Sequence, residues 1–345
     1  MAIAGADHHQ FVELGARAVY WGGISAVRAP PTLDGMARSS TRKRPSAPTA
    51  TAPEGINPKA PCPCGSGRRY KHCHGSGYAP PVTRPFEGLP GEADWVALRE
   101  LVPAATATLR TTEGREVTLA SVLPGGTPAL VRANGEILLG VQTQASSDDV
   151  SRDIGTALAA ALEAPAGAPV DPGPPGGDGP RLQDLLDLSA PFEVTVHDTF
   201  GFWLEGTDPG AAALAGLEHA NEAILPTVRL AGLDAAYWVR PSNERAHLRW
   251  VRPEPEEPLL DALARLSAAE ELTLGEGTRY AGAFRALGLV VPVWDLPADL
   301  PAEEWIGQAT EFQTRLESAL ASTAPLTSDE RRARAGLLSR QITLR

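Results

Sequence analysis

The sequence predicts an α+β fold in which the strands are mostly antiparallel and the elements form two lobes. Pairs of apolar runs indicate two β-hairpins, and the first pair is joined by Asn134-Gly135, a dipeptide typical of a two-residue turn. Long segments with apolar residues at helical spacing alternate with these strands. A Pro/Gly-rich stretch at 165–180 cannot form regular structure, so we expect it to link the two lobes.

The first lobe is predicted at 93–164, after a turn-rich linker at 78–92. Its elements are inferred from periodicity and from helix and turn signals. In chain order they are a helix with Trp95 and Leu98 on one face that ends before Pro103, strands at 105–111 and 116–123, the hairpin with a type I′ turn at Asn134-Gly135, and a helix that is capped by Ser147 and presents Val150, Ile154 and Leu158.

The second lobe is predicted at 181–325 by the same signals. In chain order its elements are a short helix near 181–187, strands near 192–205, a helix over 209–225 with Asp208 as its N-cap, a strand at 227–231, a hairpin at 235–251, a helix over 258–269, two strands around 278–294, and a helix over 302–321 that buries Trp305 and Phe312. In both lobes a hairpin precedes a long helix. The lobes are therefore either distant copies of one unit or alike by chance.

The charge of the chain, −11 overall, is unevenly distributed. Residues 36–75 contain eight Lys and Arg against one acidic residue, whereas residues 76–328 contain 16 Arg, 36 Asp and Glu, and no Lys. An acidic body repels phosphates, so we expect contact with nucleic acid only through the basic ends. No run of 18 apolar residues and no secretory signal is present, so the sequence predicts a cytoplasmic protein without a transmembrane segment.

The two ends of the chain are interpreted separately from the lobes. Residues 1–60 are expected to be a disordered leader, in which residues 1–35 are either real or an over-extended start before Met36. The basic tail at 326–345 begins with a capping box formed by Thr327 and Glu330. We expect a terminal helix that folds back on the acidic body by charge, with a phosphate or partner contact as the alternative.

The three cysteines of the chain, Cys62, Cys64 and Cys73, fall within twelve residues. A disulfide would leave one thiol unpaired, and a cytoplasmic chain would not keep it oxidised. His74 brings the number of donors to four, in the spacing C-x-C-x8-C-H, which is the number that a closed structural zinc site needs. Because protein atoms fill all four positions, we expect the zinc to be structural and not catalytic. Three incidental thiols are the alternative.

The stretch PCPCGSGRRYKHCHG at 61–75 resembles the SEC-C motif, which is known from the C-terminus of the SecA translocase ATPase. The signature positions match, including the Gly-Ser-Gly turn that follows Cys64 and the Tyr-Lys pair before Cys73. The resemblance implies a motif at 61–77 whose ligands for Zn²⁺ are Cys62, Cys64, Cys73 and His74. It also implies a docking role, because in SecA this motif is implicated in binding the SecB chaperone and in contacts with ribosomes or phospholipid.

Most of residues 61–345 also resembles an uncharacterised actinobacterial family, through phrases such as RPFEGLPGEADWVALRELVPAA, VPVWDLP and LLSRQITLR. This second resemblance implies no function. The chain has no G-x-x-x-x-G-K-[ST] phosphate loop, so a SecA-type motor is not expected.

Outside the motif the sequence shows no recognised catalytic constellation, and no catalytic residue is assigned. His197, His219 and His247 lie far apart, and the acidic pairs at helix starts are interpreted as caps. Arg249 and Arg252 flank a tryptophan on a hairpin and are a candidate for an exposed recognition strip.

Three functions remain open. The favoured one is a zinc-containing protein-interaction factor that docks on a chaperone or a ribosomal surface. The alternatives are an enzyme with a non-zinc active site between the two lobes, and a protein in which zinc serves only as a structural staple.

Overall fold

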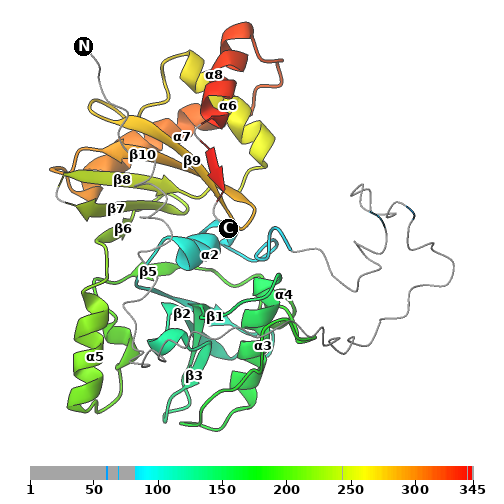
Figure 1. The fold of residues 1–345 in the computed structure, drawn as a ribbon, viewed down its shortest axis with the longest axis vertical. Helices are drawn as coiled ribbons and strands as arrows, with labels where there is room; N and C mark the ends of the chain where they lie inside the picture. The colour runs from blue at the N-terminus through cyan, green and yellow to red at the C-terminus, as the bar shows by residue number, and fades with distance from the viewer. Residues whose placement is uncertain (1–59, 61–68, 70–81, 243, 340, 344–345) are drawn as a thin grey trace, which may run out of the picture. The chain divides into compact units, whose positions relative to one another are not determined.

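The computed structural model describes residues 60, 69, 82–242, 244–339 and 341–343, and Figure 1 shows how their elements are arranged. The residues from Thr83 onward belong to one compact unit. This unit contains helices and two β-sheets, which confirms the predicted α+β fold. Its strand pairs are mostly antiparallel, as expected, while β2 with β4 and β9 with β11 run parallel.

The first sheet has the strand order β3-β4-β2-β1-β5. The predicted strands at 105–111 and 116–123 and the predicted hairpin are confirmed. The strands are β1 (Ala105–Arg110), β2 (Glu116–Val122), β3 (Ala129–Val131), β4 (Ile137–Gln142) and β5 (Val194–Val196), and the short 3-10 helix η3 (Pro124–Gly126) joins β2 to β3.

The turn between β3 and β4 differs from the predicted type I′ turn. Gly135 has a φ of 86°, but Asn134 is not among the described non-glycine residues with positive φ, and a type I′ turn needs positive φ at both positions. The Gly135 amide donates to the Arg132 carbonyl, and the Arg132 amide donates to the Glu136 carbonyl. The loop therefore has three residues, with glycine in the left-handed conformation.

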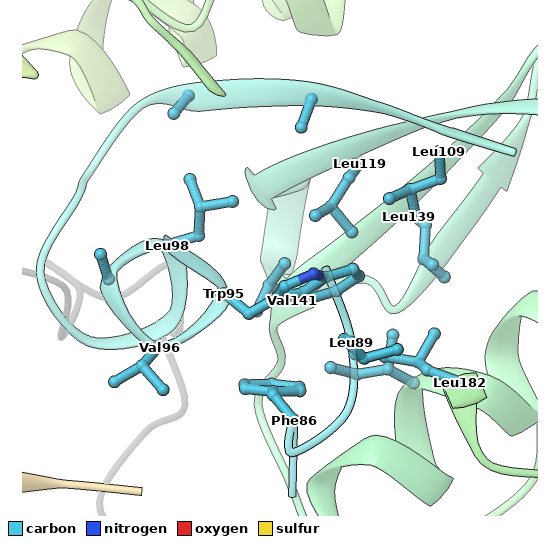
Figure 2. Packing of buried hydrophobic residues seen from close by; sticks show 14 of the residues in the cluster. Phe86, Leu89, Trp95, Val96, Leu98, Leu109, Leu119, Leu139, Val141 and Leu182 are labelled. Carbon is cyan, nitrogen blue, oxygen red and sulfur yellow. The ribbon is translucent and has the colours of Figure 1, made fainter. Parts of the chain in front are cut away.

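The core of the first lobe lies between the first sheet and three helices, α2 (Glu92–Glu100), α3 (Val150–Glu163) and α4 (Leu182–Leu185). Trp95 of α2 is buried and packs against Phe86 with ring centroids 5.4 Å apart (Figure 2). The N-cap of α3 is Asp149 and not the predicted Ser147, because the Asp149 side chain accepts a hydrogen bond from the Arg152 amide. Ser147 instead donates to the Asp153 carboxylate from both its amide and its hydroxyl.

The first sheet continues past residue 181, where the second lobe was expected to begin. β5 pairs with β1, and Leu182 of α4 belongs to the same apolar cluster as Trp95. The loop at 165–180 is irregular, as predicted, but the chain returns from it to the first sheet. A local signal of irregular backbone does not reveal which sheet the next strand joins, because strand pairing is set by distant residues.

Residues 192–225, predicted as strands followed by a helix, form one short strand, a 3-10 helix and an α-helix, and part of this region packs on the opposite face of the first sheet. β5 is followed by a 3-10 helix, η4 (Gly201–Trp203), and by α5 (Ala211–Asn221). Phe200 and Phe202 pack on this face with Leu138. Gly210 and not Asp208 is the N-cap of α5, and no side chain caps it.

The second sheet has the order β11-β9-β10-β8-β7-β6. Its strands are β6 (Thr227–Arg229), β7 (Ala236–Ser242), β8 (Arg245–Trp250), β9 (Arg279–Ala286), β10 (Leu289–Leu296) and β11 (Gln341–Thr343), and its helices are α6 (Glu256–Ala268), η5 (Ala302–Trp305), α7 (Ile306–Leu320) and α8 (Ser328–Leu338). One face of the sheet packs on α6 and α7, where the rings of Trp294 and Phe312 lie 4.9 Å apart. The predicted helices at 258–269 and 302–321 are confirmed, with Trp305 and Phe312 buried.

The C-terminal segment folds back on the body, as the charge pattern predicted. Thr327 and Glu330 form the expected capping box of α8. Arg334 contacts Asp261 at 2.6 Å and also pairs with Glu257, both on α6, and Leu337 is buried in the same cluster as Phe312. The backbone then adds β11 to the edge of the second sheet, a strand that the sequence did not predict.

The two lobes share a spatial order of strands but not their directions. β1-β2-β4-β3 corresponds in order to β7-β8-β10-β9. However, β2 and β4 run parallel, whereas β8 and β10 run antiparallel, because α6 lies between β8 and β9 and reverses the second hairpin. The lobes are therefore not strand-by-strand copies of one unit.

The turn between β9 and β10 packs closely against the backbone of Thr83, and this contact can be tested. Leu287 and Gly288 both have positive φ, and a Cβ at Gly288 would lie 2.5 Å from the Thr83 carbonyl oxygen. We expect Gly288→Ala to lower the free energy of unfolding by about 2–4 kcal/mol, from the positive φ and from the overlap together. Gly135→Ala is the matched control, since its φ is also positive but its Cβ would meet nothing within 4 Å. Urea unfolding of both variants measures the difference, and equal losses would contradict the close approach.

Candidate metal centre

The four predicted zinc ligands, Cys62, Cys64, Cys73 and His74, lie outside the residues that the structure describes. The assignment therefore stays a prediction, and the types of donor atom can be compared with those that zinc prefers. Three thiolates and one imidazole are a donor set typical of tetrahedral structural zinc, and they leave a charge of about −1 on the metal site. Arg68, Arg69 and Lys71 lie between the ligands in sequence and are suited to offset that charge. The donor set therefore fits zinc.

The described part of the chain offers no competing metal site. Among its residues, no group of three or more His, Cys, Asp and Glu side chains is arranged to hold a metal ion. The metal prediction therefore depends on residues 62–74.

The segment that follows the motif is attached firmly to the first lobe. The described part of the predicted linker at 78–92 is turn-rich, as expected, but Phe86 and Leu89 are buried in the core. The Pro85 carbonyl accepts hydrogen bonds from the side chains of Arg181 at 3.1 Å and Gln183 at 2.9 Å. These contacts fix the point at which the chain leaves the body toward the motif.

Comparison with protein families separates the same two parts. Residues 59–76 match the SEC-C motif, and residues 85–345 match a family of unknown function, DUF5926. The chain belongs to the DUF5926 family. Both resemblances inferred from the sequence are thereby confirmed, and the SEC-C match contains all four predicted ligands.

Curated relatives of this DUF5926 protein match it only locally. Protein translocase subunit SecA of Burkholderia multivorans is 42% identical over 73 residues, which are 20% of this chain and 7% of SecA. The SecA subunits of Rubrobacter xylanophilus and Caulobacter vibrioides are 48% and 52% identical over 40 residues each, which are 12% and 11% of this chain and 4% of each SecA. The chain thus spans less than a tenth of the length of these relatives. No solved structure matches it.

The first lobe contains a cavity of about 390 Å³. It lies where the loops after β2 and β4 meet the Pro/Gly-rich loop and the start of α3, so it is formed within residues 125–177 and not between the lobes. Asp153, the charged side chain that lines it, already accepts three hydrogen bonds, two from Ser147 and one from the Gly176 amide. Asp153 thereby holds the loop against α3.

A buried ionic cluster joins the two lobes, and sequence reasoning missed it. Asp94 on α2 accepts hydrogen bonds from Arg229 Nε at 3.2 Å and Nη2 at 3.0 Å, and from the Tyr237 hydroxyl at 2.6 Å. Burial and the negative charge of Asp94 raise the pKa of Tyr237 well above 10.0. Burial lowers the pKa of Arg229, but the hydrogen bond and charge of Asp94 outweigh it and raise that pKa overall. More than 130 residues separate Asp94 from its partners, so no local pattern signals the cluster.

Two further candidates from the sequence take other roles. Arg249 and Arg252 are both buried, so they do not form an exposed recognition strip. Arg252 pairs with Glu254 and lies over the Trp250 ring at 5.0 Å. His247 lies 3.1 Å from Asp295, while His197 lies 2.8 Å from the Thr106 hydroxyl and His219 is exposed beside Glu222. The three histidines are therefore not brought together.

No helix in the described part of the chain is both long and apolar enough to cross a bilayer.

Removing the carboxylate from the ionic cluster tests its structural role. We expect Asp94→Asn to destabilise the protein by about 2–3 kcal/mol, because the buried side chain loses the charge that accepts two hydrogen bonds from the half-buried Arg229 and leaves that guanidinium with only the exposed Asp234 nearby among the described residues. The matched control is Asp261→Asn, whose carboxylate meets Arg334 near the surface and should contribute less than about 1 kcal/mol. Chemical denaturation measures both, and a loss for Asp94→Asn no larger than for the control would contradict this role.

The pH dependence of stability tests the environment of Tyr237. Because the folded-state pKa is raised above 10.0, the contribution of Tyr237 to stability is complete below pH 10 and is lost as the pH rises further. We expect Tyr237→Phe to flatten the decline in stability between about pH 10 and pH 11. Urea unfolding at pH 8 and pH 11 measures this change. A decline as steep as in the wild type would show that Tyr237 does not titrate with folding.

Proposed function

We propose that this DUF5926 protein is a zinc-binding docking protein. In this proposal Cys62, Cys64, Cys73 and His74 hold one Zn²⁺, and the folded SEC-C motif binds another protein. The observation that supports it is the match of residues 59–76 to the SEC-C motif with a complete set of four donors. The local matches to SecA, a protein translocase subunit, support a role in protein binding. From the SEC-C resemblance, the proposed partner is a chaperone or a ribosomal surface in the cytoplasm.

The division of charge supports docking through the motif. Basic residues surround the motif, whereas the body is strongly acidic. Opposite charges attract partners and orient their approach, so an acidic surface of a partner would be drawn to the motif and repelled by the body. The zinc has a structural role, because its four protein ligands leave no position for water or substrate.

Zinc content in paired histidine variants tests the metal site. We expect the wild type to contain one zinc per chain, His74→Ala to lose most of it, and His72→Ala to keep it, since the adjacent histidine is not a ligand in this proposal. Elemental analysis by mass spectrometry of the purified chains gives the ratio. Loss of zinc in His72→Ala with retention in His74→Ala would overturn the ligand assignment.

Affinity capture tests the docking role separately from metal binding. We expect specific partners to be captured by the wild type and by Ser76→Ala, which changes a motif residue that is not a proposed zinc ligand, and to be lost with Cys64→Ser. Far-ultraviolet circular dichroism confirms that each variant keeps the folded body. An identical set of partners for all three proteins would contradict docking through the motif, even if zinc is bound.

A further inference from the structure

Helix α5 presents an apolar and acidic face to solvent. One side of the helix packs on the first sheet, where Leu217 contacts the apolar cluster of that face. No residue of α5 is buried, and Leu214 is 46% exposed. Leu214, Glu218 and Glu222 are spaced by four residues, so they lie in one line along the helix, and all three are exposed. We call these three residues the acidic row.

The carboxylates of the acidic row do not stabilise the helix that carries them. Residues 182–228 contain eight Asp and Glu and no Lys or Arg, so the acidic row lies in a negative field. Glu218 and Glu222 lie at the C-terminal end of α5, where the helix dipole disfavours negative charge, and the first turn has no acidic residue. Glu222 stays 76% exposed although His219 lies beside it. A cation from outside would therefore relieve both repulsions.

Helix α8 presents a face of the opposite charge. Leu337 is buried on the second sheet, which fixes one side of the helix. Arg331, Ala335 and Leu338 are spaced by four and three residues, so they share a side, and all three are exposed, Leu338 by 38%. We call them the basic row. Arg331 donates one hydrogen bond to the Leu326 carbonyl, and a guanidinium has five donors, so it is oriented and can still bind a carboxylate.

We propose that the acidic row of one chain binds the basic row of a second copy of this chain, with the two helices antiparallel. In this register Leu214 meets Leu338, and Glu222 meets Arg331. The lengths agree, because the eight residues between the ends of the acidic row rise about 12 Å and the seven residues of the basic row about 10.5 Å. The small side chain of Ala335 lets the helices approach, and antiparallel helix dipoles attract.

The positions of the two rows make this contact intermolecular. In Figure 1, α5 and α8 lie at opposite ends of the body that begins at Thr83. Each contact uses the acidic row of one chain and the basic row of the next, so one row of each kind stays available and association continues head to tail beyond a dimer.

The expected association is weak and reversible. A single pair of helices makes a small interface, and the charge of −11 on every chain opposes the approach of a second copy. The attraction is therefore local to the two rows. It does not involve the SEC-C motif, and it stands whether or not that motif binds zinc or a partner.

Sedimentation velocity of the full-length chain tests the contact by exchange of charges. We expect the average mass of the wild type to rise with concentration up to about 1 mM and to pass that of a dimer. Glu222→Arg and Arg331→Glu should each weaken association about tenfold or more, because like charges then face each other. A mixture of the two variants should associate as the wild type does, because opposite charges meet again. Glu276→Arg, which changes the net charge equally at another exposed position, is the control and should not weaken association.

A pair of leucine variants tests the apolar end of the contact. Leu214→Ser should weaken association about fivefold, whereas Leu188→Ser should not, since Leu188 is equally exposed at 47% but lies outside both rows. Circular dichroism confirms that each variant is folded. A wild type that stays monomeric over the whole range, a closed dimer as the largest species, or charge variants that associate as strongly as the wild type would overturn the proposal.

Discussion

The carboxylate of Asp94 lies buried between two guanidinium nitrogens of Arg229 and the hydroxyl of Tyr237. It joins α2, which covers the first sheet, to strands β6 and β7 of the second. The apolar contacts around it are not directional and would tolerate several relative positions of the sheets. A bidentate ion pair with a third hydrogen bond has one favourable geometry, so it selects one of these positions. Around it, Tyr237, Val251 and Val291 of the second sheet enter the core of the first lobe.

In the proposed function, the SEC-C motif and the body are stabilised by different interactions. About 15 residues are too few to bury a hydrophobic core, so the proposed zinc site would supply the free energy that folds the motif. The body depends on apolar burial around two sheets and on the cluster at Asp94. The segment from Phe86 to Leu89 lies between the motif and the rest of the body in the sequence. Phe86 and Leu89 are buried in the core of the first lobe, so the body begins at this segment. A partner that binds the motif is therefore connected to the first lobe through this buried segment.

Local signals were enough to place most elements of the fold. The periodic apolar faces of α6 and α7, the pairs β1-β2 and β7-β8, and the capping box at Thr327 all follow from residues within one or two turns of chain. Features that depend on residues distant in the sequence could not be predicted from local signals. Asp149 replaced Ser147 as a cap because Ser147 bonds to Asp153, and the type I′ turn lies at Leu287-Gly288, where the backbone of Thr83 approaches, and not at Asn134-Gly135. β5 joined the first sheet although the Pro/Gly-rich loop precedes it. For the candidate site, the cysteine spacing and the SEC-C resemblance identified the motif, whereas the cluster at Asp94 left no trace in local sequence.

The central claim is that a metal-dependent motif is attached to a body whose two sheets form a single cooperative unit. Scanning calorimetry of the full-length chain, with and without a zinc chelator, tests it most directly. We expect one transition for the body, with equal calorimetric and van't Hoff enthalpies and a midpoint that the chelator does not change. Two separate transitions, or a large shift of the midpoint on removal of the metal, would contradict the account.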